Sequence, residues 1–181
     1  FLTRSIWKVT LVGGDEVFVF RKVIDNIGAI STNALQTINL SDNRSATIFT
    51  DEQKRVLMFN GATVTDIGNI IQPSLDGLNE ARLQFSVATF DRKNYILCAT
   101  TSSASVNDIC YAFQTEIGEW TKWSQIDANA IAQIKETDKK IKTYFGNHKS
   151  FVYWMDDPDQ KNDVEGQTGV IDSVGVTNTT T

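Results

Sequence analysis

The sequence predicts an all-β protein made of consecutive four-stranded antiparallel units, the kind of unit that forms the blades of a β-propeller. Short runs rich in β-branched and aromatic residues recur along the chain, with turn signals between them. Similar runs begin at Ile6, Val56, Ile109 and Phe151, about 40 to 55 residues apart, which is the repeat length of propeller blades. Residues 95–99 lack the alternation expected of a β-sandwich strand, which favours strands buried on both faces. We therefore expect a partial propeller.

Length and composition fit a globular β protein. The chain has 181 residues, of which 41% are hydrophobic and 22% charged, so it is long enough and apolar enough to bury a sizeable core. We expect residues 1–165 to hold propeller blades as a fragment of a larger protein, and residues 166–181 to be a linker or the start of a further segment. No apolar run is long enough for a membrane-spanning helix, so no membrane anchor is expected.

The first elements form a hairpin. Residues 5–12 and 17–24 are the two strands, and the Gly13-Gly14-Asp15 sequence between them is a strong turn signal. A second turn follows at Asp25 to Gly28, where we expect the glycine to supply a positive φ.

The first complete unit follows this hairpin. Its four expected strands are residues 34–40, 46–50, 55–59 and 63–70. The Asn60-Gly61 pair between the last two is a typical signal for a two-residue hairpin turn. A short helical joint is expected over residues 73–84, because its leucines are spaced for one face of a helix.

The second complete unit, residues 85–126, is the most regular part of the chain. Its four expected strands are residues 85–90, 95–99, 109–113 and 120–126. Three further strands are expected at residues 130–135, 140–146 and 151–155, then an acidic loop at 156–163. Residues 170–176 are either another strand or part of a linker.

The order of features from Phe18 to Trp123 resembles that of the β-propeller virion proteins of short-tailed phages, a family that includes the nozzle protein (tail tubular protein B) and packaged-DNA stabilisation proteins. The shared order is a strand ending in a D-x-x-G turn, a strand leading to a Phe-x-Gly turn, a helical joint, a strand opened by D-x-x-N-Y, a Ser-rich loop and a closing Gly-x-Trp-x-x-Trp. The residues that carry it are Asp25, Gly28, Phe59, Gly61, Leu78, Asn79, Asp91, Asn94, Tyr95, Asn107, Asp108, Gly118, Trp120 and Trp123. Trp154 is expected to act with them as a large blade aromatic.

The resemblance implies a non-enzymatic structural protein of the bacteriophage tail, a nozzle or hub assembled in the host cytoplasm. Its partners would be copies of itself in a ring, and adaptor, portal and other tail proteins around the DNA-exit channel. Genomic DNA would contact it only in passing, and the net charge of −5 agrees with a surface that does not grip phosphates. No cofactor, metal site or catalytic residue is expected.

The resemblance also bears on Cys98 and Cys110. These residues lie on the two arms of one expected hairpin, with a turn centred near Ala104, so they should face each other. That separation could suit a disulfide. However, a virion protein folds in a reducing cytoplasm, so we expect free thiols in close contact.

Two other classes of function stay open. The main alternative is a glycan-binding propeller that acts as a host-surface adhesin, with Trp120, Trp123 and Trp154 as a sugar-stacking platform; packing between blades is the competing interpretation. An enzymatic propeller of the sialidase type is third, because no arginine cluster is visible and the Asp of the sialidase turn motif is missing before Gly118. His148, the only histidine, is interpreted as a solvated turn residue, and the acidic loop as solvated rather than a calcium site.

Overall fold

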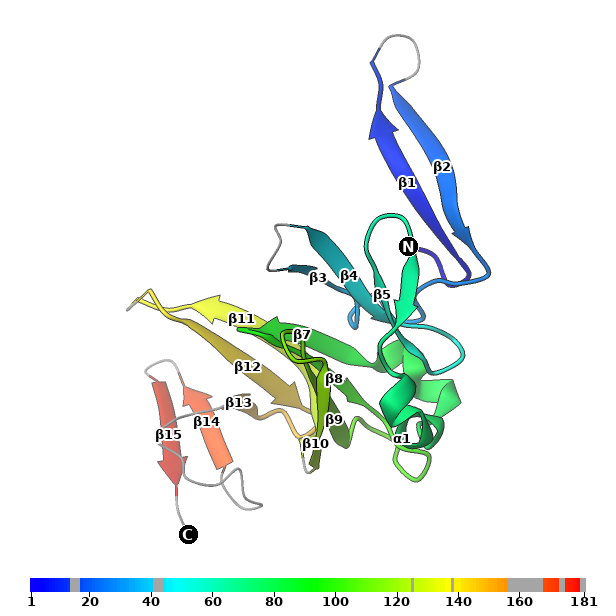
Figure 1. Cartoon of the computed structure of the whole chain (residues 1–181). Helices are drawn as coiled ribbons and strands as arrows, with labels where there is room; N and C mark the ends of the chain where they lie inside the picture. The colour runs from blue at the N-terminus through cyan, green and yellow to red at the C-terminus, as the bar shows by residue number, and fades with distance from the viewer. Residues whose placement is uncertain are drawn as a thin grey trace.

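The computed structural model describes residues 1–13, 17–40, 44–124, 126–137, 139–155, 168–172 and 175–179. The chain is mostly β, and its strands form five antiparallel sheets of two to four strands (Figure 1). Within these residues the strands do not close into a barrel or a propeller. None of the helices in the described part of the chain is long and apolar enough to cross a membrane.

The first four-stranded sheet runs in sequence order. Its strands are β3 (Gln36–Asn39), β4 (Ser45–Thr50), β5 (Val56–Phe59) and β6 (Val64–Asp66). The expected Asn60-Gly61 turn joins the last two strands, with Gly61 at φ 95°. The fourth strand is much shorter than the expected 63–70, because the chain enters a helical joint directly after it.

The helical joint is confirmed, and it is longer than expected. It consists of the 3₁₀ helix η1 (Asn69–Ile71), α1 (Gln72–Asp76) and the 3₁₀ helix η2 (Glu80–Phe85). Pro73 lies in the first turn of α1, where a proline costs no intrahelical hydrogen bond. Phe85, expected to begin a strand, instead ends η2.

The second four-stranded sheet confirms the unit expected over residues 85–126. Its strands are β7 (Val87–Asp91), β8 (Asn94–Ala99), β9 (Ile109–Gln114) and β10 (Glu119–Ser124), again in sequence order. The two runs singled out at Val56 and Ile109 are thus the third strands of the two four-stranded sheets.

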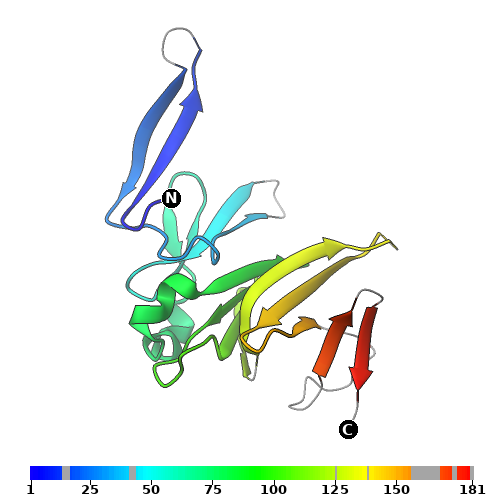
Figure 2. The same cartoon turned by 180° about the vertical axis from the view of Figure 1, so that it is seen from behind.

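Three smaller sheets make up the remainder. They are β1 (Ser5–Leu11) with β2 (Phe18–Asp25), β11 (Ala128–Lys135) with β12 (Ile141–Asn147) and β13 (Val152–Trp154), and β14 (Thr168–Asp172) with β15 (Gly175–Thr179). The last pair falls within the expected linker at 166–181, and the acidic loop at 156–163 lies outside the described residues. The β1–β2 hairpin points away from the other sheets when seen from the front and from behind (Figure 1, Figure 2).

The two four-stranded sheets pack face to face, and the helical joint contributes to the same core. Ile48 of β4 and Val56 of β5 share this core with Leu97 of β8 and Tyr111 of β9, and Leu75 of α1 fills it from the joint. All five side chains are buried. Burying this much apolar surface between two sheets is the main stabilisation of the fold.

The β7–β10 sheet is buried on its other face as well. Ile96, Cys98 and Ala112 point away from the first core and pack with Ala128 of β11 and the buried Met155 after β13. Neighbouring residues of a strand face opposite sides of the sheet, and both sides are covered here. All five residues from 95 to 99 are therefore buried. This explains why the strand lacks polar positions.

The first strands of three successive sheets lie side by side, with β7 between β3 and β11. Gln36 of β3 donates from Nε2 to the Ala88 carbonyl of β7 at 2.8 Å. Gln133 of β11 does the same to the Phe90 carbonyl at 2.6 Å. The three sheets therefore meet along their first strands and keep separate hydrogen-bond ladders.

Candidate structural site at the junction of the sheets

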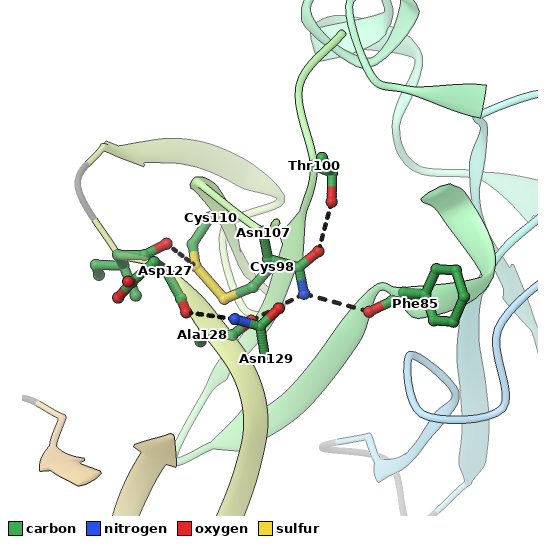
Figure 3. The surroundings of a disulfide bond; sticks show 9 residues. Phe85, Cys98, Thr100, Asn107, Cys110, Asp127, Ala128 and Asn129 are labelled. Atoms are coloured by element: carbon green, nitrogen blue, oxygen red, sulfur yellow. Dashed lines mark hydrogen bonds between the residues drawn. A yellow bond between two sulfur atoms is a disulfide. The ribbon is translucent and has the colours of Figure 1, made fainter. Parts of the chain in front are cut away.

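Asn107 lies where the helical joint, the β7–β10 sheet and the β11–β13 sheet meet, and its side chain makes hydrogen bonds to all three (Figure 3). Its Nδ2 donates to the Ala128 carbonyl at 2.9 Å and to the Phe85 carbonyl at 3.2 Å. Its Oδ1 accepts from the Thr100 hydroxyl at 2.9 Å. The side chain is 1% exposed, so it links η2, the β8–β9 loop and the start of β11 where water cannot replace it.

Asp108 fixes the same loop from the next position. Its two carboxylate oxygens accept from the Thr101 backbone N–H at 2.7 Å and from the Thr101 hydroxyl at 2.6 Å. Both Asn107 and Asp108 belong to the phage-family pattern, but the pattern predicts no contact for either side chain. Their polar side chains beside an apolar run were the signal that could have identified them.

Cys98 and Cys110 form a disulfide, so the expectation of free thiols is wrong. The predicted register is correct: Cys98 of β8 lies directly opposite Cys110 of β9, and their Cα atoms are 4.1 Å apart. The two side chains point into the same core, which brings the sulfurs together regardless of the compartment argued from the family (Figure 3). The bond cross-links the two central strands of the second four-stranded sheet.

Tyr95 joins the two four-stranded sheets by a buried hydrogen bond. Its hydroxyl donates to the Ala34 carbonyl, which precedes β3, at 2.9 Å. Complete burial raises the pKa of the Tyr95 hydroxyl well above its usual range. Tyr111 reaches the joint in the same way, donating to the Ser74 carbonyl at 3.3 Å, and its pKa is raised by burial and by the charge of Asp108.

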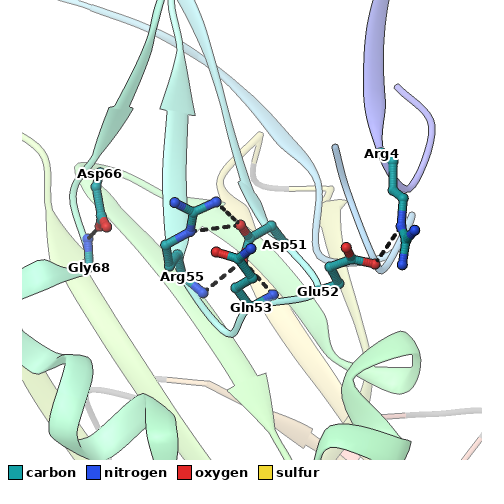
Figure 4. Close-up of polar contacts among 7 residues, drawn as sticks. All are labelled: Arg4, Asp51, Glu52, Gln53, Arg55, Asp66 and Gly68. Atoms are coloured by element: carbon teal, nitrogen blue, oxygen red, sulfur yellow. Dashed lines mark hydrogen bonds and ion pairs between the residues drawn. The ribbon is translucent and has the colours of Figure 1, made fainter. Parts of the chain in front are cut away.

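The turn between β4 and β5 is held by a buried acid (Figure 4). The Asp51 side chain accepts from the backbone N–H groups of Gln53 and Arg55, each at 2.9 Å. It also pairs with the Arg55 guanidinium at 2.6 and 2.8 Å. A carboxylate that satisfies two backbone donors and one guanidinium closes the turn without leaving a buried charge unpaired. Next to it, the exposed Arg4–Glu52 pair at 3.0 Å links the N-terminal segment to the same turn.

Gly28 is needed for close packing, and the expectation that it has a positive φ is wrong. The left-handed residue of this turn is Asn26, at φ 62°. A Cβ on Gly28 would lie 1.8 Å from the Leu2 carbonyl oxygen, which accepts the Ala29 N–H at 3.0 Å. The glycine therefore allows the N-terminal segment to cross the turn.

The remaining residues of the family pattern lie in turns and at the ends of strands, and do not form one site. Phe59 ends β5 and meets Phe1 edge to face, with ring centroids 5.8 Å apart. Asn79 precedes η2 and donates its backbone N–H to the Thr100 carbonyl at 2.9 Å. Asp91 and Asn94 pair across the β7–β8 turn. Asp25 ends β2, Gly61 occupies the β5–β6 turn, and Gly118, at φ 75°, occupies the β9–β10 turn.

The three selected tryptophans have different surroundings. Trp120 faces the first core and donates from Nε1 to the Ile67 carbonyl at 2.8 Å, whereas Trp123 packs on the opposite core. These two residues thus connect β10 to the sheets on either side of it. Trp154 of β13 lies under the Lys142 ammonium, which is 3.9 Å from the ring centroid.

His148 lies in the turn between β12 and β13 and is exposed, as expected. Its Nδ1 also lies 3.1 Å from Asp127 Oδ2. The Asp127 charge and, more strongly, burial raise the pKa of the nearby Tyr153 hydroxyl. Within the described ranges, His, Cys, Asp and Glu side chains do not gather into a group of three that could hold a metal ion.

Comparison with known proteins leaves the family open: neither a protein-family model nor a curated protein matches this chain.

Proposed function

We propose that this protein is a structural component of a bacteriophage tail, a nozzle or hub whose four-stranded sheets are blades of a β-propeller. The observation that carries the proposal is the arrangement of the sheets. Consecutive four-stranded meanders pack face to face, and their first strands lie side by side. Propeller blades are arranged in this way around their central axis.

The connections between sheets support the same proposal. β6, at one edge of its sheet, leads through the helical joint to β7, which begins the next sheet. β10 likewise leads to β11, which begins the sheet that follows. In a propeller the outer strand of one blade leads to the inner strand of the next. The order of sequence features that resembles the phage virion proteins spans the first of these connections and ends within β10.

The site chemistry supports a structural role. Tyr95, Asn107 and Trp120 each use their polar atoms to hold neighbouring elements together. A sugar-binding platform would present exposed tryptophan faces. Trp120 and Trp123 instead pack against apolar cores. The residues singled out by the family pattern thus contribute rigidity to the sheets.

The proposed role is a homo-oligomeric ring around the DNA-exit channel, in contact with adaptor or portal proteins. The net charge of −5 suits a wall along which DNA slides, because acidic side chains outnumber Lys and Arg, 22 to 17.

Cryo-electron microscopy of intact tails tests the proposal. We expect density for this chain in a ring at the portal end, with the first strand of each sheet nearest the central axis of the propeller. Fluorescence anisotropy with duplex DNA should show little binding at about 150 mM salt. A protein that stays monomeric beside portal and adaptor proteins and binds a purified host glycan would instead be an adhesin. Tight, salt-sensitive DNA binding would contradict the sliding channel.

A further inference from the structure

The β1–β2 hairpin has one face that is almost entirely apolar. The register places Leu11 opposite Phe18 and Val9 opposite Phe20, and Trp7 lies two residues before Val9 on the same face. These five residues are between 38% and 69% exposed. Such a contiguous apolar face on a folded protein indicates an interaction site, whereas single exposed apolar residues do not.

The opposite face of the hairpin is mixed. Lys8 pairs with Arg21 there, Thr10 pairs with Val19, and the exposed Val12 and Val17 lie beyond Thr10 and Val19. This face offers charged and polar groups to water, whereas the first face offers almost none. A two-stranded ribbon is marginally stable by itself in water, so the apolar face requires a covering surface.

The polar atoms on the apolar face already have partners. Trp7 Nε1 donates to the Ser5 hydroxyl at 2.9 Å. Lys22 Nζ lies 5.5 Å from the Trp7 ring centroid and 3.2 Å from Asp25 Oδ1. A partner can therefore cover Val9, Leu11 and the two phenylalanines without leaving the Trp7 or Lys22 donor without a hydrogen-bond partner. This keeps the free-energy cost of burial low.

We propose that a second copy of the chain covers this face, so that two β1–β2 hairpins pack against each other across a two-fold axis. With aromatic residues contributing about 150 to 250 Å² each when fully buried, the exposed part of the face amounts to roughly 500 Å². Two copies would bury about 1,000 Å², the lower limit for a specific interface. The hairpin also stands away from the other sheets, so a second hairpin can approach it (Figure 1).

A two-fold contact fits the surface better than a head-to-tail contact, which needs a second apolar patch of similar size. The other large apolar side chains exposed in the described residues lie at the base or the opposite face of the hairpin, or on separate elements. They are Phe1, Leu2, Val12, Val17, Val19, Ile70, Phe85, Ile117, Ile134, Ile141 and Val152. A lipid surface is disfavoured because the sequence places Asp15 and Glu16 between the two strands, and inserting the hairpin would bury their charges.

This contact does not rest on the proposed tail function. Ring contacts are head-to-tail, whereas this contact is two-fold, so either can exist without the other. Its test can therefore succeed or fail whatever the tail experiment shows.

The test compares threonine substitutions on the two faces of the same hairpin. Analytical ultracentrifugation of the 181-residue protein should show a monomer–dimer equilibrium at concentrations up to about 100 µM. Val9→Thr combined with Phe20→Thr should raise the dimer dissociation constant at least tenfold, because both side chains lie on the apolar face. Val19→Thr, on the opposite face, should leave the constant unchanged.

Two further measurements distinguish a variant that has lost the dimer contact from one that has unfolded. Circular dichroism should give the same spectrum for all variants, because the substituted residues lie outside the buried cores. Dilution of the wild type should shift tryptophan emission to the red, and Trp7→Phe should abolish the shift. A wild-type protein that is monomeric throughout this range would overturn the proposal, as would equal effects of the changes on the two faces. Co-flotation of a monomer with anionic lipid vesicles would assign the face to a membrane instead.

Discussion

Replacing Asn107 with alanine should destabilise the protein more than any other single loss of a polar side chain at the sheet junction. The change removes three hydrogen bonds. Two of the partners, the Thr100 hydroxyl and the Ala128 carbonyl, belong to residues that are 3% and 0% exposed. An unsatisfied buried group costs about 1 to 3 kcal/mol, so the loss should be about 2 to 6 kcal/mol. The Phe85 carbonyl adds little, because Phe85 is half exposed and water can reach it.

Asn129→Ala is the matched control. Asn129 lies on β11 beside Ala128, is partly buried and donates once, to the Asp127 carbonyl at 3.1 Å. Its loss should cost about 0.5 to 1.5 kcal/mol. Urea unfolding followed by tryptophan fluorescence gives both free energies of unfolding. If the two alanine variants lose the same stability, Asn107 does not hold the joint and β11 together, and the reasoning is refuted.

Titration of free thiols in the unfolded, unreduced protein should find none, and two reactive thiols would contradict the disulfide. The double variant Cys98→Ala with Cys110→Ala should lower the free energy of unfolding by up to about 3 kcal/mol, the loop-closure value for a short loop. For Tyr95, whose folded-state pKa is raised above the ordinary 10.0, stability is fully present below pH 10 and declines as the pH rises further, by at most about 1.4 kcal/mol per pH unit. Tyr95→Phe should flatten that decline in urea titrations at high pH, while an unchanged slope would show that another group causes it. Gly28→Ala should cost about 1 to 3 kcal/mol, because the new Cβ meets the Leu2 carbonyl, and a neutral effect in thermal unfolding would show that the N-terminal segment shifts freely.

Most of the secondary structure could be predicted from local sequence. Gly61 and Gly118 have positive φ angles at the turns that they mark. The runs at Val56 and Ile109 are third strands of four-stranded meanders, because β-branched and aromatic residues fill a pleated sheet that is buried on both faces. Element boundaries were less predictable. Residues 67–70 read as strand, but the Gly68 N–H bonds to the Asp66 side chain at 2.9 Å and the chain turns into the joint.

The candidate site was predicted only in part. The family pattern included the turn and strand residues that the structure places at element ends, but those residues do not gather in one place. The family pattern includes Asn107, the residue with the most hydrogen bonds at the junction, but predicts no role for it, because its three partners come from different elements. A sequence pattern carries no information about which distant carbonyl lies within hydrogen-bond distance of an amide.

The sequence by itself determined the β class, the meander order and the facing positions of Cys98 and Cys110, since these follow from propensity, turn chemistry and strand register. Only the tertiary structure decided what those positions do. It placed both sulfurs in one core, where they bond, and it made Gly28 a site of close backbone approach rather than a left-handed turn residue. It also left one face of the β1–β2 hairpin exposed. Alternation along a strand predicts that a face is to be buried, but only the folded chain shows whether its own residues cover it.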